Sequence, residues 1–305
     1  MSNLITDIKN LQLETIKNLR NSKSSNTLRA YQSDYKDFSL FCSKNGFQPM
    51  PTQPKILALY ITHLSAFSKY STLKRRLASI SILHKIKGHY IDAKHPIIME
   101  NLMGIKRTNG SNQKGKKPLL INDLKLLIKA IDESKEKDVR KIRDKALILV
   151  GFSGGFRRSE LVDLEYEDIE FVSEGVKIFV KRSKTDQSGE GMTKAIPYFD
   201  NEDFCPVKTL KSWFELVNFK NSKIFNISDK SVALIIKKYA NYAGLDSQKY
   251  AGHSLRSGFA TSTAESGAEE RSIMAMTGHK STEMVRRYIK EANLFKNNAL
   301  NKIKI

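Results

Sequence analysis

Chemically useful side chains gather in one stretch of the sequence, residues 250–290. His253 and Arg256 stand three positions apart, so on a helix their side chains project from the same face and both can contact one anion. His279 follows a glycine in an expected turn, and Tyr288 lies about two and a half helical turns further on. Arginine, histidine and tyrosine in this arrangement predict phosphate chemistry that includes a covalent step.

An arginine further upstream can join this group. Gly154 and Gly155 interrupt a predicted helix, and Arg157 follows them just before a second short helix. An arginine beside such a turn can point into a cleft, although a surface position is the alternative. Glu160 is near enough to orient that arginine, or instead to cap the N-terminus of the short helix.

A lysine is expected in a β-hairpin. Residues 176–198 alternate β-branched and polar residues on both sides of a polar turn that contains glycine. Lys184 lies in the turn region, where its flexible stem can deliver an ammonium group into a groove. Composition alone leaves three competitors for this role, which are Lys181, Arg182 and Lys194.

The charge balance indicates a polyanionic partner. Fifty-two Lys and Arg against 32 Asp and Glu leave a formal net charge of +20 at pH 7, more than solubility requires. Nucleic acid is favoured over a membrane, because the longest apolar runs are too short to span a bilayer and no lipidation motif is present. The alternative is a basic surface that is simply solvated. The N-terminal segment lacks the apolar core of a signal peptide, so a cytoplasmic, nucleoid-associated protein is expected.

The cysteines and histidines predict neither a metal site nor a disulfide. Cys42 and Cys205 are far apart and have no second ligand at metal-binding spacing. The spacings of four further histidines match no zinc pattern, and these are His63, His84, His89 and His95.

The 305 residues, 40% of them hydrophobic, are enough for two domains with separate cores. Residues 1–107 predict a compact domain of four or five helices with a basic face. Residues 108–118 are rich in Gly, Asn, Ser and Lys and contain no apolar residue, which predicts a basic linker. Residues 119–305 combine predicted helices, the hairpin and a C-terminal tail. The predicted fold class is mainly α with a small antiparallel β-sheet.

Basic residues of the helical domain and the linker are candidate contacts to the DNA backbone. Lysine and arginine bound to phosphates give affinity without sequence information. For each residue the alternative is a solvated surface charge. The candidates are Lys74, Arg75, Arg76, Lys85, Lys87, Lys114, Lys116 and Lys117.

Three separated motifs resemble those of the tyrosine recombinase family, also called the phage integrase family. GFRRSELVDLEYEDI looks like the family's first-arginine box, HSLRSGFAT like its H-x-x-R box, and TGHKSTEMVRRYIK like its Gly-His pair followed by the nucleophilic tyrosine. The resemblance covers the chain from about Pro118 to the end. The first half is similar to the family's core-binding domain in size, helicity and charge. The resemblance implies a helical, SAM-like core-binding domain followed by a mixed α+β catalytic domain.

The resemblance also implies a reaction. Tyr288 would attack a DNA phosphodiester to give a 3′-phosphotyrosine and a free 5′-hydroxyl, and the strands would rejoin without metal, cofactor or ATP. Arg157 and Arg256 would each hold non-bridging oxygens, a role that suits the planar guanidinium. A tyrosine with an ordinary pKa of about 10 is a poor nucleophile at neutral pH, so its site must favour loss of the proton.

Three more roles follow from the same resemblance. His279 would donate a hydrogen bond to a non-bridging oxygen, His253 would help to manage the tyrosine proton, and Lys184 would protonate the departing 5′-oxygen. The family box shows one arginine where this chain has two, and the register of Gly155-Phe156 favours Arg157 over Arg158.

The implied function is site-specific DNA recombination, such as integration or excision of mobile DNA. Residues 292–305 form a short amphipathic tail that packs on its own domain or, as in the family, on a neighbouring protomer of a tetramer assembled on two DNA sites. Accessory DNA-bending proteins are further possible partners. Two alternatives stay open, a type IB topoisomerase-like relaxation of DNA and a non-catalytic DNA-binding accessory protein.

Overall fold

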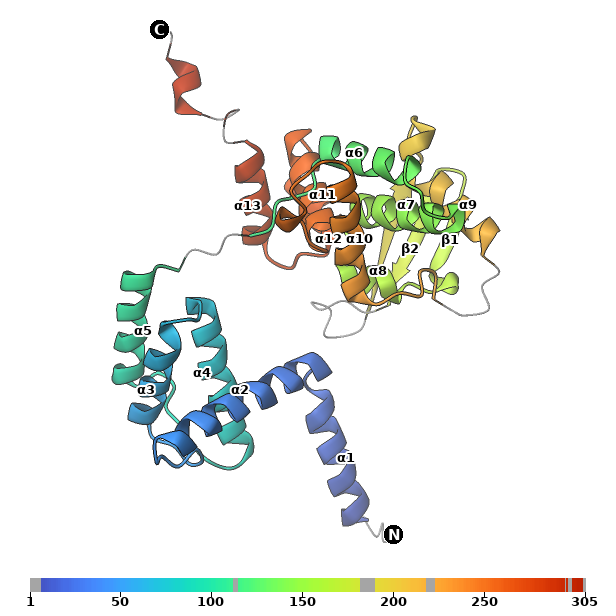
Figure 1. Ribbon diagram of the computed structural model, residues 1–305. Coiled ribbons are helices and arrows are strands. Elements are labelled where there is room, and N and C mark those ends of the chain that lie inside the picture. The colour runs from blue at the N-terminus through green and yellow to red at the C-terminus, as the bar shows by residue number, and fades with distance from the viewer. Residues whose placement is uncertain are drawn as a thin grey trace. The chain divides into compact units, whose positions relative to one another are not determined.

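A computed structural model of the chain describes residues 7–111, 115–181, 190–217, 223–293, 295 and 298–303. The chain divides into two compact units, residues 1–114 and 115–305, and the division falls inside the stretch expected to be a linker. Helices dominate both units, and the second unit contains one three-stranded antiparallel sheet (Figure 1). The predicted fold class is therefore confirmed.

Helices are the only regular secondary structure among the described residues of the first unit. Four of its helices surround a common core, with α2 packed on α4 and α3 packed on α5. Proline is the first residue of both α3 and α5, where its missing N–H has no helical partner to lose. The unit contains α1 (Ile8–Asn21), α2 (Ser25–Lys44), α3 (Pro54–Ser65), α4 (Tyr70–Ile86) and α5 (Pro96–Asn109).

The second unit is built around α7, whose central residues 146–150 are all buried. On this helix pack α9 and α11, and the sheet contributes its inner face to the same core. The helices before α11 are α6 (Ile121–Asp132), α7 (Asp138–Ser153), α8 (Arg158–Asp163), α9 (Pro206–Leu216) and α10 (Asp229–Tyr242).

The sheet has strand order β1-β2-β3, with each neighbouring pair antiparallel. The predicted hairpin is confirmed as β2 (Gly175–Val180) and β3 (Met192–Pro197), in register with Val176 opposite Ile196. A third strand, β1 (Ile169–Val172), was not expected from the sequence. It has only four residues and no fully buried side chain, so its pattern is weak.

Three C-terminal helices complete the second unit, α11 (Ser254–Glu265), α12 (Glu270–Thr277) and α13 (Thr282–Ala292). Small residues let the chain approach α11 closely. A Cβ added to Gly258 would lie 2.0 Å from the carbonyl oxygen of Leu119, which belongs to the segment entering the unit. Ser281 caps α13, the helix that carries Tyr288, by accepting a hydrogen bond from the Glu283 N–H.

Within the described part of the chain, every helix is too short or too polar to cross a lipid bilayer.

Candidate active site

Arg157 lies at the N-terminus of α8, where one carboxylate holds it in two ways. Its backbone N–H donates to Oε2 of Glu160 at 3.0 Å, and its Nη1 donates to Oε1 of the same side chain at 2.6 Å. Glu160 is buried. It therefore fills both roles left open by the sequence, capping the helix and orienting the arginine. The far end of the guanidinium, Nη2, is 3.5 Å from the carbonyl oxygen of Gly278.

Arg158 is directed differently. Its side chain is half exposed, and Nε lies 3.1 Å from a carboxylate oxygen of Asp229, on α10. Only the first of the two adjacent arginines therefore faces the segment that carries His279.

Arg256 is fully buried in the first turn of α11. Its Nη1 donates to the carbonyl oxygen of Gly155 at 2.9 Å, whereas Nε and Nη2 have no acceptor among the residues that the structure describes. Burial, together with the charge of Arg157, lowers the pKa of Arg256 to about 10, so the group is still a cation at neutral pH. A buried cation with unused donors is costly unless an anion joins it.

His253 and Tyr288 face one another. His253 immediately precedes α11, and its Nε2 lies 3.4 Å from the phenolic oxygen of Tyr288. Tyr288 is buried on α13, in a small cluster with Val285 and residues of α11 and α12. Burial and the charges of Arg256 and Arg157 lower the pKa of His253, so its ring is neutral at pH 7 and can accept a proton.

His279 follows Gly278, which ends α12 in the left-handed conformation with φ of 62°. Nδ1 of His279 lies 2.8 Å from the hydroxyl of Thr277, a fully buried residue. Burial lowers the pKa of His279 to about 4, and the nearby charges of Arg256 and Arg157 add to the effect. The ring centroids of His279 and Tyr288 are 6.2 Å apart.

The structure thus brings five of the six predicted catalytic residues into one site in the second unit. Lys184 lies outside the described residues, as does its competitor Arg182. Lys181, another competitor, forms ion pairs with Glu165 and Asp168.

Lys194 is the group whose importance the sequence did not reveal. It is 1% exposed on β3, and its Nζ donates to the carbonyl oxygen of Gly154 at 2.6 Å and to that of Met276. Burial lowers its pKa to about 7. One signal was available, because strand alternation puts Lys194 on the same buried face as Ile196.

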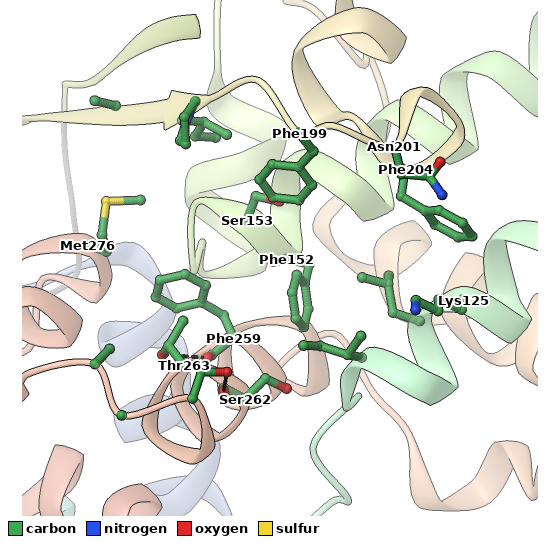
Figure 2. Close-up of a pocket in the computed structure, with 18 residues that line it drawn as sticks. Lys125, Phe152, Ser153, Phe199, Asn201, Phe204, Phe259, Ser262, Thr263 and Met276 are labelled. Atoms are coloured by element: carbon green, nitrogen blue, oxygen red, sulfur yellow. Dashed lines mark hydrogen bonds between the residues drawn. The ribbon is translucent and has the colours of Figure 1, made fainter. Parts of the chain in front are cut away.

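A pocket of about 760 Å³ lies near the site, between α6, the end of α7, β3 and α11. Phe152, Phe199 and Phe259 surround it, with Lys125 on one side and Met276 on the other (Figure 2). Its wall is mostly apolar. The hydroxyls of Ser153 and Ser262, which also line it, are buried and have no hydrogen-bond partner among the described residues.

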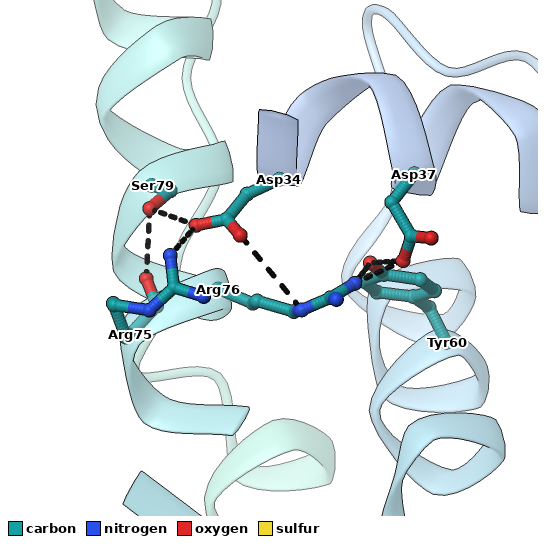
Figure 3. A network of polar contacts seen from close by, with 6 residues as sticks. All are labelled: Asp34, Asp37, Tyr60, Arg75, Arg76 and Ser79. Carbon is teal, nitrogen blue, oxygen red and sulfur yellow. Dashed lines mark hydrogen bonds and ion pairs between the residues drawn. The ribbon is translucent and has the colours of Figure 1, made fainter. Parts of the chain in front are cut away.

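Two predicted DNA contacts of the first unit are engaged within the unit itself. Arg75 pairs with Asp34, whose carboxylate also accepts a 2.7 Å hydrogen bond from Ser79. Arg76 pairs with Asp37 and donates to the Tyr60 hydroxyl at 2.6 Å (Figure 3). The two arginines join α4 to α2 and α3, so part of their charge is neutralised locally. DNA contact by either residue stays a prediction.

Of the remaining candidate DNA contacts, some are exposed and others bind groups within their own unit. Lys74, Lys85 and Lys87 are exposed on or just after α4. Lys116 donates to the Gln248 carbonyl oxygen at 2.6 Å, and Lys117 lies 2.9 Å from Asp123. Lys114 is outside the described residues. Among the residues described, no group of three His, Cys, Asp or Glu side chains is arranged to hold a metal ion.

The chain is mainly helical, and its second unit brings two arginines, two histidines and a tyrosine into one site. The model of the phage integrase family matches residues 118–294. An integrase/recombinase XerD homolog of Selenomonas ruminantium is 42% identical, with 96% of this chain and 89% of the relative covered. A tyrosine recombinase XerC of Thermodesulfovibrio yellowstonii is 28% identical, with 88% and 87% covered.

Solved structures share the fold. The site-specific recombinase XerH, in a post-cleavage complex with a palindromic difH substrate, aligns with a TM-score of 0.66 at 20% identity, over 98% of this chain and 92% of that one. A lambda integrase dimer bound to a COC′ core site aligns with a TM-score of 0.59 at 20% identity, over 96% and 98%. The chain belongs to the phage integrase family and is a tyrosine-type site-specific recombinase.

Proposed function

We propose that Tyr288 cleaves a DNA strand through a 3′-phosphotyrosine and that the chain rejoins strands between two sites. The observation that carries this proposal is the unused hydrogen-bonding capacity of Arg256. Arg256 is fully buried, and its Nε and Nη2 have no acceptor among the described residues, so its charge is poorly compensated there. A phosphate with two non-bridging oxygens matches the two donors, because a guanidinium presents its N–H groups as a planar fork.

Arg157 supplies a second cation to the same phosphate. Glu160 takes one edge of its guanidinium, which fixes the side chain without abolishing its positive charge. Charges held in this way need no rearrangement when negative charge develops on the phosphate in the transition state. The two arginines therefore provide the stabilisation that this reaction requires.

The proton of Tyr288 goes to His253. The 3.4 Å separation is slightly longer than an ideal hydrogen bond, and such contacts tighten when a substrate is bound. Because His253 is neutral at pH 7, it can take the proton as the tyrosine oxygen attacks phosphorus. His279 contacts a non-bridging oxygen, and Lys184 protonates the departing 5′-oxygen. The bond energy is kept in the phosphotyrosine, so a free 5′-hydroxyl can reseal the strand without ATP.

The substrate is double-stranded DNA, and the working assembly is a tetramer on two sites. Among the similar structures are XerH bound to difH and a lambda integrase tetramer bound to a Holliday junction. Membership of the family favours recombination over simple relaxation of supercoils or non-catalytic binding. Accessory DNA-bending proteins and a nucleoid-associated, cytoplasmic location complete the proposal.

The C-terminal tail joins the protomers of this tetramer. Its apolar side chains are exposed in the single chain, with Phe295 at 85%, Leu300 at 65% and Ile303 at 58%. The pocket surrounded by Phe152, Phe199 and Phe259 is an apolar receptor for the tail of a neighbouring copy. The hydroxyls of Ser153 and Ser262, which have no partner among the described residues, would donate to backbone carbonyls of the incoming tail.

The test begins with the DNA site. DNA ends that remain attached to the protein in its host are sequenced, and a nicked duplex of that sequence is then used to trap the covalent adduct. Tyr288→Phe keeps the ring and its packing, so it is expected to bind this duplex nearly as well as wild type and to form no adduct. An adduct formed by Tyr288→Phe would overturn the assignment of the nucleophile.

A further inference from the structure

Lys194 occupies a position that the chemistry outlined above does not explain. Its side chain is almost completely buried, and its Nζ lies 4.5 Å from the centroid of the Phe156 ring. The ammonium donates to two backbone carbonyls that come from segments far apart in the sequence, Gly154 and Met276. A lysine is rarely buried this deeply unless its charge is compensated.

Both carbonyls belong to the C-terminal ends of helices. Gly154 directly follows α7, and Met276 lies in the last turn of α12. Such carbonyls have no partner inside their own helices, and the helix dipoles make these ends negative. Lys194 therefore supplies a hydrogen-bond donor to the carbonyl oxygens at two helix ends and balances the partial negative charge of both.

These helix ends lead straight into the site. Arg157 stands three positions after Gly154, and His279 stands three positions after Met276. The next carbonyl in the first turn, that of Gly155, is held by Arg256 at 2.9 Å. Successive carbonyls of the arginine turn thus accept hydrogen bonds from two buried basic side chains, so the orientation of its peptide groups is strongly constrained.

The strand that carries Lys194, β3, also contacts the turn before His279. Met192, the first residue of β3, lies against Gly278, since a Cβ added to that glycine would lie 3.0 Å from the Met192 sulfur. Lys194 thus connects the turn before Arg157 and the turn before His279 to β3.

We propose that Lys194 is a positioning residue for strand cleavage, which fixes the turns before Arg157 and His279 to each other and to β3. The inference rests on the proposed function, because it concerns the same cleavage step. Lys194 does not contact the DNA itself, since its ammonium is enclosed and bound to backbone. Small displacements matter here, because misplacing a catalytic group by about 1 Å can cost on the order of 100-fold in rate.

The experiment compares cleavage and binding in Lys194→Met. Methionine keeps most of the length and an apolar contact with Phe156 but donates no hydrogen bond, so two buried carbonyls lose this donor. We expect the rate of adduct formation on the nicked duplex to fall by roughly 10- to 100-fold, while the Kd for the same duplex changes less than about threefold. Lys194→Gln keeps one hydrogen-bond donor, so its rate of adduct formation is expected to lie between those of wild type and Lys194→Met. It allows the same comparison if the methionine variant folds poorly.

Two controls separate positioning from other causes. Leu127→Ala removes a buried side chain of α6 and lowers Tm without touching the site, so its cleavage rate at a temperature where it is folded should match wild type. The second control is a duplex with sulfur in place of the bridging 5′-oxygen, whose thiolate leaves without a proton because thiols are far more acidic than alcohols. This duplex should restore cleavage by Lys184→Ala but not by Lys194→Met.

Each outcome is informative. A wild-type rate for Lys194→Met on the ordinary duplex would overturn the positioning role, and so would restoration by the sulfur duplex, since Lys194 would then be the proton donor. A loss of rate in Lys194→Met that disappears at a temperature where the variant is fully folded, as expected for Leu127→Ala, would also overturn it. Failure of wild type to form any adduct would contradict the proposed function instead.

Discussion

Thr277 fixes the hydrogen on the ring of His279. The Thr277 hydroxyl donates its only proton to the carbonyl oxygen of Ile273 at 2.6 Å, so at 2.8 Å it must accept a hydrogen bond from Nδ1 of His279. In the neutral ring Nε2 then carries the lone pair. Hydrogen-bond donation from Nε2 to a phosphate oxygen requires the ring to gain a proton, and the anion of the DNA provides the reason for that gain.

The free chain is therefore expected to hold His279 neutral well below pH 6.5. Burial and two guanidiniums lower its pKa to about 4, so the folded chain binds fewer protons than the unfolded chain between about pH 4 and 6.5. This group thus costs stability as the pH falls through that window, roughly 1–2 kcal/mol at pH 5. The ring signal of His279, followed by NMR, should titrate near pH 4 in wild type, and His279→Gln should lose less stability than wild type between pH 7 and 5. Titration at or above 6.5 would contradict the buried, cation-flanked site.

Arg256→Lys tests the two unused donors directly. Lysine can still reach the Gly155 carbonyl oxygen but cannot present a planar pair of N–H groups to a phosphate. The rate of adduct formation should fall by about 10²–10³-fold, the scale of a lost transition-state donor. The Kd for the duplex and the far-UV circular dichroism should change little. A variant that cleaves at the wild-type rate would remove Arg256 from the phosphate site.

The sequence was most informative where chemistry and local turn signals coincide. The turn at Gly278 before His279 and the H-x-x-R spacing at the start of a helix are local features, and both are found in the structure. The three-residue spacing at a short helix start also placed Glu160 near Arg157, although the sequence left its two roles as alternatives.

Long-range pairing was not predictable from the same signals. Lys194 meets carbonyls that lie 40 and 82 residues away, so nothing in its neighbourhood identifies those partners. Arg76 likewise pairs with Asp37, 39 residues upstream, and the sequence treated it as a surface cation available to DNA. Charged side chains of this kind are assigned by the fold, because a residue's exposure depends on which elements pack against it.

Lys117 and Lys85 are both candidate DNA contacts, but only Lys117 forms an ion pair among the described residues. The Lys117 ammonium lies 2.9 Å from Asp123 and 3.2 Å from the Tyr250 hydroxyl, whereas Lys85 is exposed on α4 without an ion pair to any described residue. Lys117→Met should lower the unfolding free energy by up to about 1 kcal/mol, since the ammonium is partly exposed. It should leave the dependence of log Kd on log salt unchanged.

Lys85→Met is the matched comparison, with the same chemical change on the predicted DNA-binding face. Loss of one phosphate contact should reduce the magnitude of the salt slope by about one and leave stability nearly unchanged. Equal slopes for Lys85→Met and wild type would remove Lys85 from the DNA contacts, and a reduced slope for Lys117→Met would mean that its ion pair opens on DNA.

Gly258→Ala tests the close passage of the chain over α11, which holds Arg256. The new Cβ would lie 2.0 Å from the Leu119 carbonyl oxygen, and backbone cannot yield as a flexible side chain can. The second unit should lose about 2–4 kcal/mol of stability, by analogy with other overpacked or strained core positions. Gly104→Ala in α5 is the control, because its Cβ would meet nothing within 4 Å and alanine stabilises a helix relative to glycine by roughly 0.5–1 kcal/mol. Urea unfolding of both variants measures the two effects, and a Gly258→Ala chain as stable as wild type would show that the segment at Leu119 is not packed tightly on α11.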